Sequence, residues 1–261
     1  MRDTESPESC RKRTSAARMF AAWARDRGLT EAVATAPPRR RDAPDYAPHA
    51  FTRAELARFF DACDSIEPYM GRLESRLRKI QCPAFFRLLY SSGMRTTEAR
   101  MLRRVDVDLS TGVVSVVRSK GPDQHYVALH PSMLEVMRAY DAAAEALQPD
   151  REWLFQSSRG GFHGRSWVAL NFRGLWELAN GSADGVWAYQ LRNNYVTENI
   201  GSWECDPLEQ GDRLLWLSKS MGHRSVGSTL RYLSATPVLA GKLQRLTGES
   251  MDSIVPDVWE A

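Results

Sequence analysis

A histidine and a tyrosine nine positions apart could do chemistry in the stretch from Gly222 to Tyr232, whose sequence is GHRSVGSTLRY. Gly222 follows an apolar helix pattern and is expected to end that helix, while Ser225 can cap a short second helix that carries Tyr232. His223 is therefore expected in the turn between two helices, where it could share a pocket with the tyrosine. Tyr232 is a candidate nucleophile, although a tyrosine on a short helix more often belongs to a core or a surface.

A tyrosine that attacks a phosphodiester needs particular partners. A phenol has a pKa of about 10, so it is a poor nucleophile at neutral pH unless a base or nearby cations assist it. Guanidinium groups match the charge that spreads over the phosphate oxygens, and a lysine or histidine can protonate the leaving oxygen. Enough fixed cations around the phosphate would remove the need for a metal. The chemistry therefore asks for two arginines, a lysine and a histidine.

The chain offers a candidate for each of these roles. Arg95 lies in a predicted turn, and Glu98 follows one helical turn later, where its carboxylate could orient the guanidinium. Lys120 lies at the tip of a predicted hairpin, and Arg192 lies at the start of an apolar helix. Taken singly, each is more often a surface residue, and a histidine such as His223 more often caps a helix. Their order and local context together favour one shared site.

The elements that position these residues are predicted to be mainly helical. Apolar residues recur at helical spacing in segments at 14–29, 69–92, 133–147, 167–178 and 187–200, with shorter helices after Thr52, after Gly93 and over 238–246. Between 105 and 129 the spacing changes to that of strands, at 105–109, 113–117 and 125–129. An antiparallel meander is the simplest assembly of the three strands. We therefore predict a mainly α fold, of the α+β type, with one small three-stranded antiparallel sheet.

Two places are expected to interrupt the helices. Pro83 should break or restart the helix over 69–92, because proline has no amide hydrogen to donate inside a helix. The polar segment over 201–212 is expected to be an excursion between two helices.

Composition and charge limit the class of protein. The 261 residues are 43% hydrophobic and 26% charged, which is ordinary for one globular domain with an extension. A net charge of +3 barely favours nucleic acid, so local clusters must carry any phosphate binding. The four cysteines are far apart and are expected to be reduced thiols, not a metal site. No signal peptide or membrane-spanning run is present, so we expect a cytoplasmic protein.

The chain is expected to have two parts. Residues 1–48 would comprise a disordered start through residue 13, a single helix over 14–29, and a basic proline-rich linker. The linker contains Arg39, Arg40 and Arg41, which would suit a segment that crosses a phosphate backbone. Residues 49–261 would form the main domain together with a C-terminal tail.

The segment LLYSSGMRTTEARML at 88–102, followed by VDVDL at 105–109, resembles the first sequence box of the tyrosine recombinases, the phage integrase and Xer group. The Lys120 hairpin, the Leu-Arg pair at 191–192 and the stretch that ends at Tyr232 follow in that family's order. The resemblance covers about residues 51–246. It implies a helical DNA breaking-rejoining catalytic domain, with double-stranded DNA as its partner and self-assembly as a synaptic tetramer. Such a protein would be nucleoid-associated when bound to DNA.

The resemblance also implies residue roles. Arg95 and Arg192 would clamp the scissile phosphate, Glu98 would support the first arginine, and Lys120 would protonate the leaving 5′ oxygen. His223 would assist on the phosphate or in proton transfer. Tyr232 would attack to give a 3′-phosphotyrosyl bond, and no ATP, metal or other cofactor would be required.

The chain departs from the family pattern at several positions. Tyr189 stands three residues before Arg192, where the family usually has histidine. A phenol can donate a hydrogen bond to phosphate but cannot act as a general base near neutral pH, so reduced or retuned activity is expected. Asn193 also replaces a residue that is often histidine, and the segment from Arg192 to His223 is longer than usual. At the N-terminus only 14–29 resembles the last helix of a core-binding domain, as in a truncated product, a fragment or a minimal form.

The sequence is compatible with three functions. The first is a site-specific recombinase or integrase of a mobile element, and the second is a catalytically impaired DNA-binding remnant of one. The third is a topoisomerase-like enzyme that relaxes DNA. A stripe of apolar residues in the tail could pack on its own domain or dock on a neighbouring subunit: Val238, Leu239, Leu243 and Leu246.

Overall fold

The computed structural model describes residues 7–33, 48–117, 124–203, 207–223 and 225–230. The chain divides into two compact units, Met1–Tyr46 and Ala47–Ala261. The described part of the first unit contains helix α1 (Pro7–Asp26). The prediction of disorder through residue 13 was therefore wrong from residue 7 onward, because proline suits the first turn of a helix, where its missing amide hydrogen costs nothing. Gly28 follows the helix with φ +66°, as expected of a residue that ends it.

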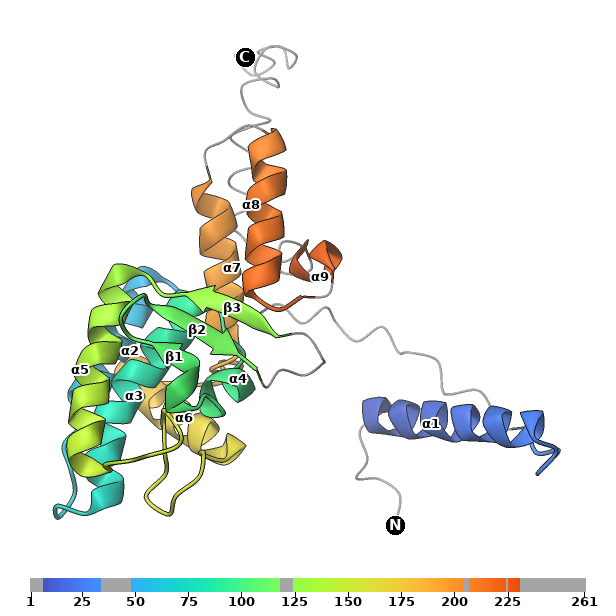
Figure 1. Cartoon of the computed structure of the whole chain (residues 1–261), viewed down its shortest axis with the longest axis horizontal. Coiled ribbons are helices and arrows are strands. Elements are labelled where there is room, and N and C mark those ends of the chain that lie inside the picture. Colours follow the sequence, from blue (N-terminus) through green and yellow to red (C-terminus); the bar gives the residue numbers. More distant parts are fainter. Residues whose placement is uncertain (1–6, 34–47, 118–123, 204–206, 224, 231–261) are drawn as a thin grey trace, which may run out of the picture. The chain divides into compact units, whose positions relative to one another are not determined.

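The second unit is mainly helical with one small sheet, which confirms the predicted fold class (Figure 1). Its described elements are α2 (Arg53–Asp64), α3 (Leu73–Ser92), α4 (Thr96–Arg100), the 3₁₀ turn η1 (Arg104–Asp106), β1 (Val107–Asp108), β2 (Val113–Val116), β3 (His125–Ala128), α5 (Pro131–Leu147), α6 (Arg165–Asn180), α7 (Gln190–Ser202), α8 (Pro207–Ser220) and α9 (Val226–Leu230). None of the described helices is long and apolar enough to cross a membrane.

The sheet is the predicted antiparallel meander, in the order β1-β2-β3. Val114 pairs with Val107 on one side and with Val127 on the other, and all three side chains are buried. Tyr126 points the other way and is 70% exposed, as the two-residue alternation of a strand requires. The first strand is shorter than predicted because η1 takes up 104–106.

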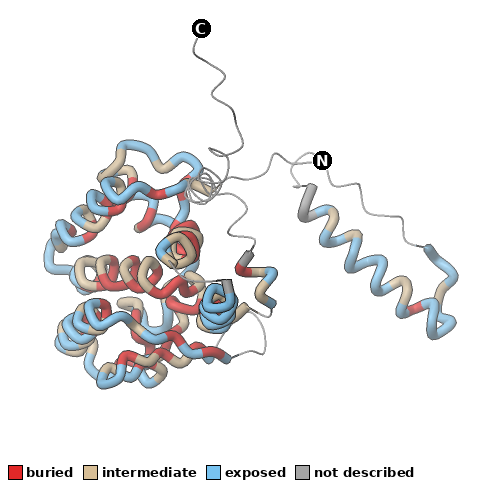
Figure 2. Tube along the Cα trace, turned by 90° about the horizontal axis from the view of Figure 1, so that it is seen from above, coloured by how far each residue is buried: buried red, intermediate tan, exposed pale blue. Residues whose placement is uncertain are grey.

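Aromatic side chains fill the core between α2, α3 and α6. Phe59 of α2 lies 5.4 Å from Phe86, 5.1 Å from Phe172 and 5.5 Å from Trp176, measured between ring centroids. All four side chains are buried. Figure 2 shows buried residues running along the helices of this unit, whereas most of α1 is exposed. The large apolar area removed from water makes the second unit the part of the chain with a core.

Pro83 does not break α3, which continues through it from Leu73 to Ser92. The proline removes one backbone hydrogen bond, but the neighbouring Cys82 and Phe85 side chains are both buried, and packing retains the helix. The start of the helix was also misplaced. Met70 and Gly71 have positive φ values of 49° and 64°, which a right-handed helix cannot accommodate, so α3 begins after them.

The segment over 201–212 is also not wholly an excursion, because α8 begins at Pro207. Helices α7 and α8 lie side by side beyond the sheet (Figure 1) and bury a small core of their own, made of Val196, Leu217 and Met221. Both helices contribute to this core, whereas the described side chains over 208–213, at the start of α8, are exposed. Outside this core, Trp216 of α8 is 74% exposed.

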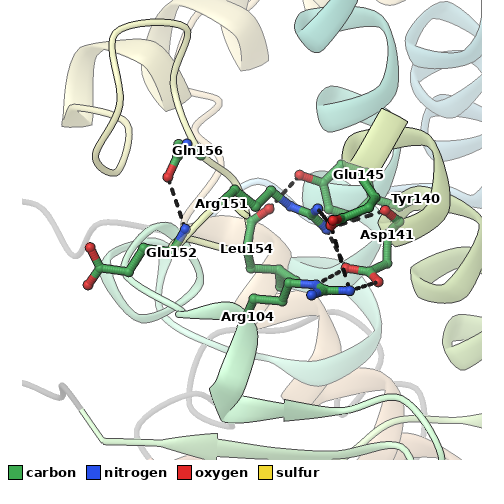
Figure 3. Close-up of polar contacts among 8 residues, drawn as sticks. All are labelled: Arg104, Tyr140, Asp141, Glu145, Arg151, Glu152, Leu154 and Gln156. Atoms are coloured by element: carbon green, nitrogen blue, oxygen red, sulfur yellow. Dashed lines mark hydrogen bonds and ion pairs between the residues drawn. The ribbon is translucent and has the colours of Figure 1, made fainter. Parts of the chain in front are cut away.

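An ion-pair network fastens α5 to the chain around the sheet (Figure 3). The Arg151 side chain is fully buried and donates through Nη1 to Glu145 at 2.8 Å and through Nη2 to Asp141. Arg104 of η1 donates Nε and Nη2 to the two oxygens of Asp141, each at 3.1 Å. Burial raises the pKa of Asp141, but the hydrogen bonds and charges of Arg104 and Arg151 outweigh it and hold the pKa below its usual range. Asp141 therefore stays ionised and joins α5 to η1 and to the segment after α5.

Candidate active site

Arg95 occupies the turn between α3 and α4, as the glycine stop at Gly93 predicts. Gly93 ends α3 in the left-handed conformation, with φ 63°, and Arg95 immediately precedes the first residue of α4. Glu98 is buried and accepts from the Arg95 backbone N–H at 2.8 Å and from Arg95 Nη1 at 2.5 Å. One carboxylate thus holds both the backbone and the guanidinium of Arg95, whose side chain keeps 27% of its surface exposed.

Arg192 lies in the first turn of α7 and is buried, with 1% of its surface exposed. Its Nη1 donates to the carbonyl oxygen of Gly93 at 2.6 Å, and its Nη2 donates to the carbonyl oxygen of Met221 at 2.9 Å. The guanidinium therefore connects the end of α3 to the end of α8. A cation this deeply buried is costly, so its orientation is firmly held by these acceptors.

His223 lies beside Arg192, with 2.7 Å between its Nε2 and Arg192 Nη2. Because a guanidinium can only donate, Nε2 must accept, which places the imidazole proton on Nδ1. Nδ1 then donates to Oγ1 of the buried Thr229, 2.7 Å away. Burial, followed by the charges of Arg192 and Arg95, lowers the pKa of His223 to about 4. The histidine is therefore neutral near neutral pH.

The turn after α8 brings the two arginines together. Arg95 Nη2 donates to the carbonyl oxygen of Gly222 at 3.2 Å, next to the Met221 carbonyl that accepts from Arg192. The structure thus brings four of the sequence-predicted residues to one place, since Glu98 holds Arg95 and His223 contacts Arg192. They come from three separate elements: α4, α7 and the turn after α8.

Two glycines in this cluster are each covered by an aromatic ring. A Cβ added at Gly93 would lie 2.3 Å from Cδ1 of Tyr195, and a Cβ at Gly222 would lie 2.6 Å from Cε1 and Nδ1 of His125. Sequence reasoning missed Tyr195, His125 and Thr229. Of these three residues, only His125 could have been found from the sequence, because strand alternation places its side chain on the same face of the sheet as the buried Val127.

The remaining predicted site residues are Tyr189, which is partly exposed, and several that lie outside the described residues. Tyr189 immediately precedes α7 and is 48% exposed, and its carbonyl oxygen accepts from the Arg192 N–H at 3.1 Å. The described part of α9 ends at Leu230, two residues before Tyr232. Tyr232, Lys120, the linker arginines and the tail stripe all lie outside the described residues. Among the side chains that are described, no group of three or more histidine, cysteine, aspartate or glutamate residues could hold a metal ion.

Comparison with known proteins gives matches to one family. The sequence model of the phage integrase family matches residues 50–237. The Sinorhizobium fredii protein y4rE, provisionally named an integrase/recombinase, is 29% identical over 203 residues, which cover 76% of this chain and 63% of y4rE. Tyrosine recombinase XerC of Xanthomonas campestris is 27% identical over 229 residues, which cover 87% of this chain and 64% of XerC. The chain thus spans less than two thirds of each relative.

Among solved structures, a dimer of lambda integrase residues 75–356 bound to a COC′ core site matches with a TM-score of 0.60 and 16% identity. The match covers 88% of this chain and 75% of that one, and it shows that the fold is shared. Because the family model matches well over half of the residues, and because the fold agrees, the chain belongs to the phage integrase family and its larger unit is a tyrosine recombinase catalytic domain.

Proposed function

We propose that this chain is the catalytic part of a site-specific DNA recombinase or integrase that cuts and rejoins DNA through a phosphotyrosyl bond. The observation that carries the proposal is the convergence of Arg95 and Arg192 on one turn, which also holds His223. Two guanidinium groups fixed before the substrate arrives form the kind of preorganised cationic site that stabilises a phosphoryl transition state. Family membership supports DNA as the substrate.

The two arginines would divide the work of binding the phosphate. Arg95 reaches the surface, and Glu98 fixes its orientation, so it would meet the phosphate oxygens first. Arg192 is buried behind it and would supply charge in a site with little water, where each electrostatic contact is stronger. With this much fixed positive charge, the reaction would require neither a metal nor ATP.

Tyr232 would be the nucleophile. Its oxygen would bond to phosphorus while the bond from phosphorus to the 5′ oxygen breaks, and Lys120 would protonate that leaving oxygen. The neutral Nε2 of His223 would receive the phenolic proton once the phosphate replaces it as a partner of Arg192. One phosphodiester is exchanged for a phosphotyrosyl ester, so the reverse reaction with a new 5′ hydroxyl would rejoin the DNA. Tyr189 would add a hydrogen bond to the phosphate.

The organisation of the whole protein is part of the proposal. Residues 1–48 would act as a helix and basic linker, and residues 49–261 would act as the catalytic domain with its tail. The solved lambda integrase fragment is a dimer on its core site, which supports assembly of this protein on DNA, with a synaptic tetramer as the working form. In the cell the protein would then be associated with the nucleoid.

A suicide DNA substrate tests the function directly. The nicked substrate is drawn from DNA that flanks the protein's own gene, so that a cut releases a short end and traps any covalent adduct. Wild-type protein should give an adduct that resists denaturation, and Tyr232→Phe should give none. Tyr126→Phe, which changes an exposed tyrosine on β3, serves as the matched control and should retain the adduct.

The outcomes separate the alternatives. Salt-dependent DNA binding by folded protein, without any adduct on the flanking-DNA pool, would point to a non-catalytic remnant and contradict the proposal. Relaxation of supercoiled plasmid without recombinant product would point instead to a topoisomerase-like activity.

A further inference from the structure

His125 is a buried histidine that packs against the candidate site but is not one of the predicted site residues. It is the first residue of β3 and is 8% exposed. Its ring covers Gly222 so closely that a Cβ there would lie 2.6 Å from Cε1 and Nδ1 and 3.1 Å from Nε2. The ring therefore packs directly on the backbone of the turn after α8.

That turn carries three of the groups that organise the site. The carbonyl oxygen of Met221 accepts from Arg192, and the carbonyl oxygen of Gly222 accepts from Arg95. The next residue is His223, whose Nε2 accepts from Arg192. A shift of the Gly222 backbone would therefore move the acceptors of both guanidinium groups together.

His125 also begins the strand that follows the β2–β3 connection, which is the connection that contains Lys120. The contact between the His125 ring and Gly222 is thus a point where the sheet meets the turn that carries His223. Both glycine conformation and ring shape matter here, since Gly222 has φ +62° and no side chain to separate the two surfaces.

We propose that His125 is a positioning residue for phosphoryl transfer. Its ring packs on the 221–223 turn and holds the backbone there, so that the carbonyl acceptors of Arg95 and Arg192 keep their positions relative to His223. The inference rests on the proposed function. It assigns His125 no contact with substrate and no proton transfer. The proposed role depends on the shape of the ring, which packs on the Gly222 backbone.

The test compares two replacements of the ring. His125→Ala removes the surface under Gly222 and should lower the single-turnover cleavage rate at saturating DNA by at least about tenfold, because misplacement by about 1 Å can cost a hundredfold. The dissociation constant for DNA should change by less than about threefold, since phosphate contacts outside the site dominate DNA affinity. His125→Phe keeps a flat ring and should recover most of the lost rate.

A double-mutant cycle tests the contact itself. Gly222→Ala should slow cleavage, both because its Cβ meets the His125 ring and because its φ is positive. In the His125→Ala background the same change should cost less, because the ring is no longer in the way. Additive effects of the two changes would show that ring and glycine do not act together and would overturn the proposal.

Two controls keep the result interpretable. His130, an exposed histidine beyond the other end of β3, should tolerate replacement by alanine with an unchanged cleavage rate. Circular dichroism and thermal unfolding identify any variant that fails to fold. Equal losses in His125→Ala and His125→Phe, or a loss confined to DNA affinity, would reject a positioning role.

A readout without DNA separates this inference from the proposed function. The nitrogen chemical shifts of His223 should report a proton on Nδ1 in the wild type and in His125→Phe. In His125→Ala these chemical shifts should change, because Nε2 of His223 is no longer held at hydrogen-bonding distance from Arg192. If wild-type protein never cleaves DNA, the proposed function fails while the chemical shifts still test the position of the turn; unchanged shifts in His125→Ala would sink the inference.

Discussion

His223 shows how a side chain's chemistry depends on its neighbours. Its Nε2 accepts from Arg192 and its Nδ1 donates to Thr229, so the neutral form is selected by hydrogen bonding as well as by burial. With a pKa of about 4, the imidazole holds a second proton only weakly while it lies among these cations. When a phosphate binds, its negative charge would favour the protonated form, and the same residue would then be able to donate to a phosphate oxygen.

The folded protein should lose stability in mild acid, because two of its histidines have lowered pKa values. Burial and the charge of Arg100 lower the pKa of His163 to about 4, as burial and two arginines do for His223. In the unfolded chain each histidine binds a proton below pH 6.5, whereas in the folded protein it does so only near pH 4. The unfolded state therefore binds more protons in this window, and the free energy of unfolding falls as the pH drops from 6.5 to about 4.

Urea unfolding followed by tryptophan fluorescence at several pH values measures this slope. His163→Gln removes one of these two histidines and should make the decline in unfolding free energy shallower than in the wild type. An equally steep decline in His163→Gln would show that this histidine does not link stability to pH.

The site residues are positioned by the ends of helices and by the turns that follow them. Gly93 stops α3, and the next turn presents Arg95; Gly222 follows α8, and the next residue is His223. The ends are held in turn by rings that leave no room for a side chain, Tyr195 on the first glycine and His125 on the second. Helix α5 packs on α3 and strand β3 packs on α8, so both lie against helices that end at the site.

The buried Arg151 network should dominate the stability of that support. Arg151→Ala would remove the fully buried cation and leave Asp141 and Glu145 with only the partly exposed Arg104, and losing one member of a buried ion pair costs up to about 3–5 kcal/mol. The free energy of unfolding in urea should fall by an amount of that order. Arg173→Ala breaks an exposed pair with Glu177 and should cost less than about 1 kcal/mol. Similar losses for both variants would contradict the assignment of a structural role to the buried network.

The whole molecule combines a weakly charged chain with a proposed substrate, DNA, that is a polyanion. A net charge of +3 over 261 residues cannot by itself bind DNA strongly, so local clusters must do so. The site supplies Arg95 and Arg192, and the sequence places three more arginines at 39–41, between the first helix and the catalytic domain. Binding of DNA and chemistry on DNA should therefore depend on different parts of the chain.

Replacing Arg39, Arg40 and Arg41 by alanine together should weaken DNA binding without slowing cleavage at saturating DNA. Each phosphate contact contributes about 0.9 to the slope of log affinity against log salt, so the slope should fall by up to about 3. Fluorescence anisotropy of labelled duplex DNA over a salt series measures the slope. A control triple that replaces exposed, ion-paired cations should change it little: Lys79, Arg138 and Arg173. An unchanged slope in the linker triple would exclude phosphate contacts by these arginines.

Local sequence determined the features that depend on neighbouring residues. The helix after Thr52, the helix after Gly93 and the meander of three strands were all predicted, because caps, stops and strand alternation act within a few residues; the Thr52–Glu55 capping box, for example, begins α2. The order of the boxes around Arg95 and Arg192 also predicted the family.

Only the tertiary structure decided how these pieces meet. Arg95 reaches a carbonyl 127 residues away and Arg192 reaches one 99 residues away, and no local pattern encodes such contacts. Packing also overruled a local signal at Pro83, where buried neighbours outweigh the preference of the backbone. The ring of His125 on Gly222 and the proton on Nδ1 of His223 arise in the same way, because burial and hydrogen-bond partners exist only once distant segments have packed together.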